Sequence, residues 1–338
     1  MFDTFDKLKF ILTKNQRSSI IYLFFLMVVG AALETLGIGL VLPALILMVQ
    51  ADIASSYPIL KPIISFLGYP SQSEIVIYGM MSLVLVYLIK NFFLGYLAWR
   101  QSKFIYGVQS DFSQFLFSGY LHQTWVQHIQ RNSSELIRNA MNEVNVLVSS
   151  GLSAGLSLAT ELLVMFFIVI LLIALEPVSA LTALLGLGLF GWVFHKITSN
   201  YLKKYGAQRM YHDGLRIQHL QQGLNGLKDV KILGRESAFS NVYKIHAKAS
   251  ANNARRAHVI SQIPRLLLEV LAISGITILI LMMVLNDRAM EDVIPMIGLF
   301  GVAVFRVMPS VNRILLAVQG LRYGLPVIDG LYNEKLTL

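Results

Sequence analysis

The residues of this sequence best suited to chemistry are basic and polar side chains inside its last apolar segment, 293–318. Arg306, Asn312 and Arg313 interrupt that segment. Seven residues separate the two arginines, which places them on one face of a helix and about 10 Å apart along its axis. An arginine within a membrane helix is costly, so it usually faces protein, water or a ligand. The alternative is that the side chain snorkels to the membrane surface, which suits Arg313, near the helix end, better than Arg306.

Two other apolar segments carry a basic residue. Lys90 lies within 75–99, and Arg265 directly precedes 266–285. Together with Arg306 and Arg313 they could form one basic belt in the inner half of a membrane. Arginine suits bidentate recognition of phosphate, and a water-filled cavity would remove most of the burial cost.

Three acidic residues partly offset this belt. Arg265 and Glu269 are four residues apart on one helix, so a simple structural ion pair is an equal alternative for them. Glu34 and Glu161 have no partner within their own helices. The sequence assigns them no chemistry.

Composition defines the class of protein. Of 338 residues, 55% are hydrophobic and 14% are charged, whereas soluble domains carry about 25% charged residues. Several apolar runs are long enough to cross a bilayer, so the sequence predicts a one-domain, multi-pass membrane protein. The absence of cysteine excludes disulfides and thiolate metal sites. The formal charge of +9 fits basic cytoplasmic loops better than a nucleic-acid surface.

The predicted fold is an all-α membrane domain with six spans. Residues 1–19 begin with alternating apolar and charged positions, typical of an interfacial helix. The spans are expected at about 20–49, 75–99, 152–175, 178–195, 266–285 and 293–318. The segments on one side of these spans hold 22 lysines and arginines and those on the other side hold two. Both termini are therefore expected in the cytoplasm.

The two long cytoplasmic connections show helical spacing of apolar residues, so the spans should continue as helices well beyond the membrane. Helices of this kind need a partner surface at their tips. The tips themselves carry specific motifs. One reads GLKDVKILGRE (226–236) and the other reads WVQHIQRNSSELIR (125–138).

These two motifs resemble the coupling-helix regions of ABC exporters, whose transmembrane domain has six spans (type IV). Ser134 stands in place of the usual glycine, Glu143 in place of the usual aspartate, and Arg138 falls one position early. The resemblance covers the whole chain. It implies a homodimer and a nucleotide-binding partner domain, separate or missing, which contacts these residues: Trp125, His128, Ser134, Glu135, Gly234, Arg235 and Glu236.

A narrower likeness is to bacterial lipid-linked oligosaccharide flippases. It rests on LETLGIGLVLPAL (33–45), IPRLLLE (263–269) and VFRVMPSVNRI (304–314). The likeness implies a bacterial cytoplasmic (inner) membrane, membrane lipid around the protein and an anionic polyprenyl-pyrophosphate-linked oligosaccharide as cargo. The substrate-binding residues that it implies are Lys90, Arg265, Arg306, Asn312 and Arg313.

The chain is not expected to be an enzyme on its own. It contains no G-x-x-x-x-G-K-[ST] phosphate loop and no L-S-G-G-Q signature. ATP and Mg²⁺ are therefore expected on the nucleotide-binding partner, with 319–338 as the start of a linker to it. No catalytic residue, bound cofactor, metal site or nucleic-acid partner is predicted. The pattern Gly151–Gly155 fits a nucleophile motif, but its G-x-x-x-G spacing favours close helix packing.

Two alternatives to the flippase remain open. The first is an ABC exporter for another lipid, a peptide or a drug. The second is a membrane fragment that transports nothing.

Overall fold

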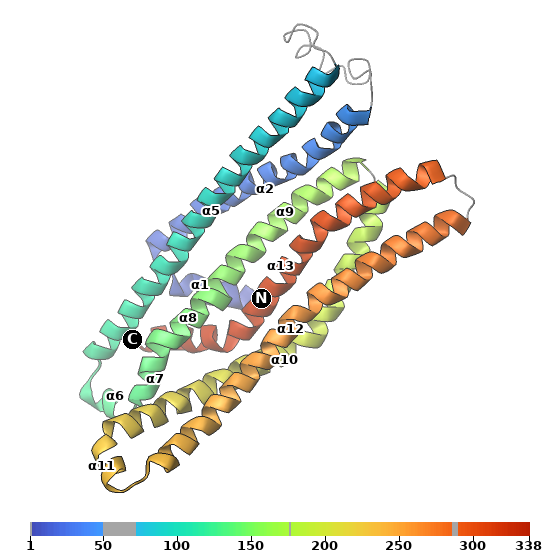
Figure 1. Ribbon diagram of the computed structural model, residues 1–338. Helices are drawn as coiled ribbons and strands as arrows, with labels where there is room; N and C mark the ends of the chain where they lie inside the picture. The colour runs from blue at the N-terminus through green and yellow to red at the C-terminus, as the bar shows by residue number, and fades with distance from the viewer. Residues whose placement is uncertain (1, 50–71, 176, 286–289) are drawn as a thin grey trace.

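The computed structural model describes residues 2–49, 72–175, 177–285 and 290–338, and over these residues all regular structure is helical. Six long helices form the body (Figure 1): α2 (Lys14–Val49), α5 (Gln72–His122), α9 (Ala154–Leu175), α10 (Pro177–Asn225), α12 (Glu236–Leu285) and α13 (Met290–Thr337). The 51 residues of α5 span about 75 Å, more than twice the ~30 Å of bilayer hydrocarbon. The predicted extensions beyond the membrane are confirmed.

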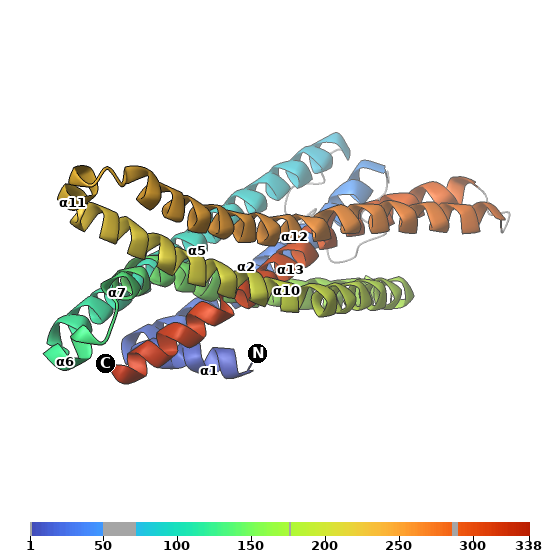
Figure 2. The same ribbon diagram turned by 90° about the horizontal axis from the view of Figure 1, so that it is seen from below.

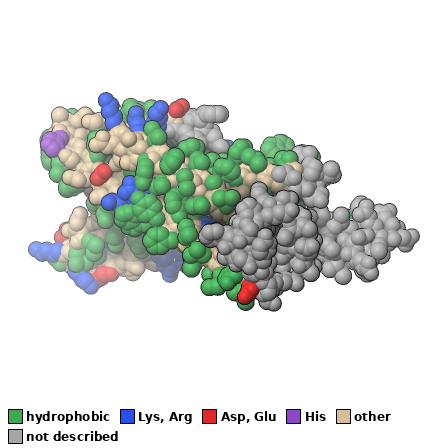
Figure 3. Space-filling model, turned by 90° about the horizontal axis from the view of Figure 1, so that it is seen from above, with side chains coloured by type: hydrophobic (Ala, Val, Ile, Leu, Met, Phe, Trp, Pro, Cys, Tyr) green, Lys and Arg blue, Asp and Glu red, His purple; other side chains and the backbone are tan. Residues whose placement is uncertain are grey.

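The described helices contain five segments that are long and apolar enough to cross a membrane: Lys14–Gly37, Val76–His122, Ser133–Leu171, Glu236–Gly275 and Val307–Thr337. On the face shown in Figure 3, hydrophobic side chains cover the middle of the described part, and lysines and arginines lie mostly around its margin. The chain is therefore a multi-pass membrane protein. Eight of the eighteen residues of the predicted fourth span, 178–184 and 187, have side chains outside the described residues.

Short helices complete the architecture. The helix α1 (Phe2–Ile11) takes the place of the predicted interfacial helix. The helices α6 (Trp125–Ile129) and α11 (Leu227–Ile232) lie at the same end of the molecule (Figures 1 and 2). Between α6 and α9 the chain runs through α7 (Ser133–Arg138), the π-helix η2 (Asn139–Glu143), α8 (Val144–Val146) and the π-helix η3 (Leu147–Ser153).

The largest apolar core ties the two ends of the chain to its middle. Ile11 from α1, Leu116 from α5, Leu147 from η3 and Ile328 and Leu331 from α13 are all buried within it. Residues 319–337, predicted as the start of a linker, continue α13 and supply part of this core.

Glycines set the closest helix crossings. A Cβ atom built on Gly206 of α10 would lie 2.2 Å from the backbone oxygen of Tyr323 on α13. Gly324 of α13 packs in the same way on Ser150 of η3, where the corresponding distance to the Cβ atom is 3.0 Å. Of the two glycines where close packing was expected, Gly151 is buried, with atoms of Leu8 and Ile328 at 3.6 Å from its built Cβ, whereas no described atom lies within 4 Å of the built Cβ of Gly155. The close approach falls on Ser150 instead.

Pro264 lies within α12 and is almost fully buried. Proline has no N–H, so α12 makes one hydrogen bond fewer at this position. The helix continues on both sides of it.

Candidate transport site and coupling surface

Arg313 of α13 pairs with an acid on a neighbouring helix. Its Nε lies 2.9 Å from Oε1 of Glu161 on α9. The Glu161 side chain is 9% exposed and that of Arg313 is 52% exposed, so the acid is buried while the arginine reaches open space. The two charges balance each other at the contact between α9 and α13.

Lys90 lies elsewhere, in the contact between α5 and α2. It is buried, its Nζ sits 4.2 Å from the centre of the Tyr87 ring, and it packs against Gly37 of α2. The Tyr87 hydroxyl donates to the backbone oxygen of Gly37 at 3.1 Å. A cation–π contact of this kind holds an ammonium group where water is scarce.

The other predicted substrate-binding residues lie on α12 and α13. Arg265 pairs with Glu269 at 3.2 Å on the exposed side of α12, as the structural alternative expected. Asn312 has a buried Oδ1 with no hydrogen-bond partner in the described part of the chain. The side chain of Arg306 lies outside the described residues. Leu268 on α12 packs against Val311 on α13, which brings the Arg265 turn beside the Asn312 turn.

The predicted belt is thus divided. Arg265 lies on the exposed side of α12, Arg313 lies at the contact between α13 and α9, and Lys90 lies in the contact between α2 and α5. In each case an acid or an aromatic ring already stabilises the positive charge. A phosphate would have to replace these contacts or add to them.

The tip helix α6 exposes apolar side chains. Trp125, Val126 and Ile129 are 74, 65 and 66% exposed. The His128 side chain lies outside the described residues. Ser134 is buried, and its N–H and hydroxyl both donate to Oδ1 of Asn132 at the start of α7.

The second tip, α11, has the same character. Ile232 and Leu233 are 70 and 69% exposed. Gly234 follows with φ +58°, a left-handed conformation that glycine adopts without strain. The turn leads to Arg235, which is exposed, and then to Glu236, whose carboxylate lies 3.1 Å from Nζ of Lys231. At the other tip Glu135 is exposed, 3.7 Å from Arg138.

A buried ionic network braces the helices behind these tips. Glu143, fully buried at the end of η2, lies 3.5 Å from Arg138 and 3.2 Å from Arg209 of α10. Arg209 also pairs with Asp213 at 3.1 Å, and Asp213 accepts from Ser250 of α12 at 2.7 Å. Burial raises the pKa of the Glu143 carboxyl, and Arg209 and Arg138 oppose that rise. The network therefore joins helices α6 and α7, here called the α6–α7 arm, to helices α10 and α12, here called the α10–α12 hairpin.

No protein-family model matches the chain. A solved structure described as a bacterial Atm1-family ABC exporter with ATP bound superimposes on it with a TM-score of 0.66 at 13% identity. The superposition covers 94% of this chain and 53% of that chain, so this chain spans about half the length of its structural neighbour. This chain has the fold of an ABC exporter transmembrane domain.

The two tips also carry apolar residues that the sequence motifs did not indicate as contacts for a partner domain. Val126, Ile129, Ile232 and Leu233 are more exposed than most apolar residues outside the membrane part. The signal in the sequence was present for Val126, Ile232 and Leu233, since each lies in a short apolar run beside polar residues. Such a run is equally typical of a buried turn, so exposure needed the structure.

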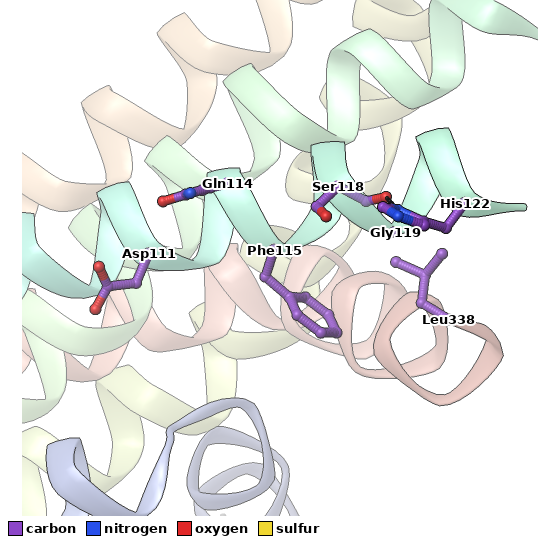
Figure 4. A pocket seen from close by; sticks show the side chains of 7 residues that line it. All are labelled: Asp111, Gln114, Phe115, Ser118, Gly119, His122 and Leu338. Carbon is purple, nitrogen blue, oxygen red and sulfur yellow. Dashed lines mark hydrogen bonds between the residues drawn. The ribbon is translucent and has the colours of Figure 1, made fainter.

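One further pocket lies on the extended part of α5 (Figure 4). It has a volume of about 420 Å³ and is lined by Asp111, Gln114, Phe115, Ser118, Gly119, His122 and Leu338. None of the residues predicted for transport or coupling lines it. Among the described residues, no three His, Asp or Glu side chains are arranged to hold a metal ion.

Proposed function

We propose that this chain is the transmembrane part of an ATP-driven exporter that works as a homodimer with nucleotide-binding domains. The observation that carries the proposal is the placement of α6 and α11 at one end of an exporter-type helix bundle, with apolar side chains exposed on both. Exposed apolar patches of this kind indicate contact with another protein. ATP and Mg²⁺ would be bound by that partner.

We further propose a bacterial cytoplasmic membrane, cytoplasmic termini and an anionic cargo, a polyprenyl-pyrophosphate-linked oligosaccharide. This cargo is supported by Lys90 and Arg313, which carry positive charge within the apolar segments Val76–His122 and Val307–Thr337, and by the buried Asn312 Oδ1, which can accept from a sugar hydroxyl. The main competing proposal is an exporter of another lipid, a peptide or a drug. It is favoured by the pairing of Arg313 with Glu161, which reduces the charge open to a phosphate.

The cargo is tested by purifying the tagged chain from detergent extract with its bound partners and measuring ATP hydrolysis. We expect hydrolysis to rise with a pyrophosphate-linked oligosaccharide lipid and not with a neutral lipid of the same chain length. Arg306→Ala/Arg313→Ala should abolish that rise. The matched control, Lys203→Ala/Lys204→Ala, removes two exposed charges from α10 and should keep it. Equal stimulation by the neutral lipid would favour the competing cargo, and absence of any associated ATPase would contradict the exporter.

The coupling surface is tested separately. Ile232→Asp/Leu233→Asp should abolish association with the nucleotide-binding partner without changing thermal stability, because both side chains are exposed. Leu220→Asp, on the exposed side of α10 before the tip, is the control and should leave association intact. Unchanged association in the double variant would place the partner elsewhere.

A further inference from the structure

A second basic site lies between the beginning of α2 and the middle of α5. A pocket of about 220 Å³ opens here. Gln16, Ser19 and Leu23 from α2 line one wall, and α5 supplies the rest: Arg100, Lys103, Phe104, Gly107, Val108 and Asp111. Arg100 and Lys103 directly follow the predicted second span, so the pocket lies at the level where membrane meets water.

The two basic side chains are held by aromatic rings and not by acids. The guanidinium carbon of Arg100 lies 5.1 Å from the centre of the Tyr22 ring and 5.9 Å from that of Trp99. Nζ of Lys103 lies 5.4 Å from the same Trp99 ring. Within the described ranges, neither residue has a carboxylate at ion-pair distance. Nε of Arg100 is buried with no hydrogen-bond partner there.

Asp111 is the one acidic residue that lines this pocket, and it lies at the end away from Arg100 and Lys103. Asp111 lies eight residues after Lys103, about 12 Å along α5, and accepts from Nε2 of Gln16 at 2.9 Å. It therefore does not cancel the charge at Arg100 and Lys103. The basic end of the pocket is left with two cationic groups and the exposed Ser19 side chain.

An exposed aromatic row leads from this basic end toward the middle of the membrane. Phe92, Tyr96 and Trp99 are 83, 40 and 55% exposed. Together with Lys103 they are spaced by four, three and four residues, which places them on one face of α5. From Phe92 to Lys103 the helix rises about 16 Å, close to the ~15 Å thickness of one hydrocarbon leaflet.

We infer that this pocket binds the head group of an anionic phospholipid of the leaflet at that end of the spans, with an acyl chain lying along Phe92, Tyr96 and Trp99. The phosphate takes charge-assisted hydrogen bonds from Arg100 and Lys103, which lack acidic partners. Basic pockets between transmembrane helices bind anionic head groups in this way. The aromatic row explains why the ligand is a lipid and not a free phosphate. The inference does not depend on the cargo of the exporter.

The test is native mass spectrometry of the full chain in detergent, titrated with phosphatidylglycerol or with phosphatidylcholine of the same acyl chains. We expect tighter binding of phosphatidylglycerol. Arg100→Gln/Lys103→Gln should weaken it about thirtyfold, at roughly fivefold for each basic residue near a membrane surface. The charge-matched control, Lys203→Gln/Lys204→Gln, should bind as the unaltered chain does.

A second variant keeps both charges and fills the pocket. No atom lies within 4 Å of a Cβ built on Gly107, so Gly107→Leu is expected to fold and to exclude the head group. Loss of phosphatidylglycerol binding in this variant would support the site even if the double charge variant does not fold. Equal binding of the two lipids by the unaltered chain, or unchanged binding in Gly107→Leu, would overturn the inference. Full competition by inorganic phosphate would overturn the lipid as its source.

Discussion

Arg313 on α13 and Glu161 on α9 lie 2.9 Å apart, so one of the arginines predicted to bind an anionic cargo already faces a carboxylate. This relationship makes the pair a structural tie between two helices as well as a feature of the proposed site. The two roles are separable, because stability responds to the pairing and cargo recognition responds to the net charge.

Arg313→Gln should lower the stability of the chain by about 2 kcal/mol, because it removes an ion-pair partner from a buried carboxylate. The expected loss of stability is smaller than for a fully buried pair, because about half of the Arg313 side chain is exposed. Glu161→Gln/Arg313→Gln should regain most of the loss. The measurement is thermal unfolding in detergent for both single variants and the double variant. Additive effects of the two single changes would show that the pair contributes nothing.

Gly206→Ala should separate α10 from α13. The added methyl group would lie 2.2 Å from the backbone oxygen of Tyr323, which cannot rotate away. We expect a loss of about 2 kcal/mol or more, typical of overpacking. Gly188→Ala on the same helix is the control, because no atom of the described residues lies within 4 Å of its built Cβ. Similar unfolding temperatures for the two variants would contradict the close crossing.

Glu143→Gln should loosen the α6–α7 arm from α10. It removes the carboxylate that lies between Arg138 and Arg209 and leaves Arg138 with Glu135 and Arg209 with Asp213 as their remaining acids, at a cost of about 3 kcal/mol. Hydrogen exchange should rise in both α7 and α10. Glu135→Gln removes an exposed acid from the same arm and should leave exchange unchanged. Faster exchange confined to α7 would indicate that the network does not reach α10.

The α10–α12 hairpin should lose stability at acidic pH. Nδ1 of His246 lies 3.1 Å from Nδ1 of His212, and the His246 ring stacks on His219 with centroids 5.3 Å apart. Burial, followed by the charges of His219 and His212, lowers the pKa of His246 below its usual 6.5. The folded state therefore binds this proton less readily than the unfolded chain, so stability is complete above pH 6.5 and falls as the pH drops toward the lowered pKa.

The measurement for this pH effect is thermal unfolding on both sides of pH 6.5. His246→Gln should flatten the profile, whereas His258→Gln, farther along α12, should not. A profile that His246→Gln leaves unchanged would mean that the stacked rings do not set the pH dependence.

The local sequence pattern was sufficient to predict the helices, but it was insufficient to predict the contacts between them. Apolar length placed α9 within about two residues of the predicted 152–175 span, and helical spacing predicted that the second span continues as a helix beyond the membrane, as α5 does. The ion pair of Arg265 with Glu269 followed from a four-residue spacing within one helix. The pairing of Arg313 with Glu161 and the network around Glu143 depend on which helices meet and at what rotation. No spacing within a helix contains that information.

The π-helical turns show the same limit. Nothing in the types of residues from Asn139 to Glu143 requires a π-helix, which is rare and commonly found at functional positions. Its extra residue per turn shifts the face that Glu143 presents and carries the carboxylate into the core. A prediction from regular α-helical periodicity would rotate that side chain away from Arg209.

The proline inside α12 divides that helix into two arms. From Glu236 to Pro264 the arm is about 42 Å long, and from Pro264 to Leu285 it is about 32 Å. A stiff rod that pivoted at Pro264 would move its outer end in the direction opposite to its tip and by about three quarters of the distance. A displacement of a few ångströms at α11 would then produce a slightly smaller displacement, in the opposite direction, at the Leu285 end of α12 across the membrane. No series of small side-chain movements between the two ends would be needed.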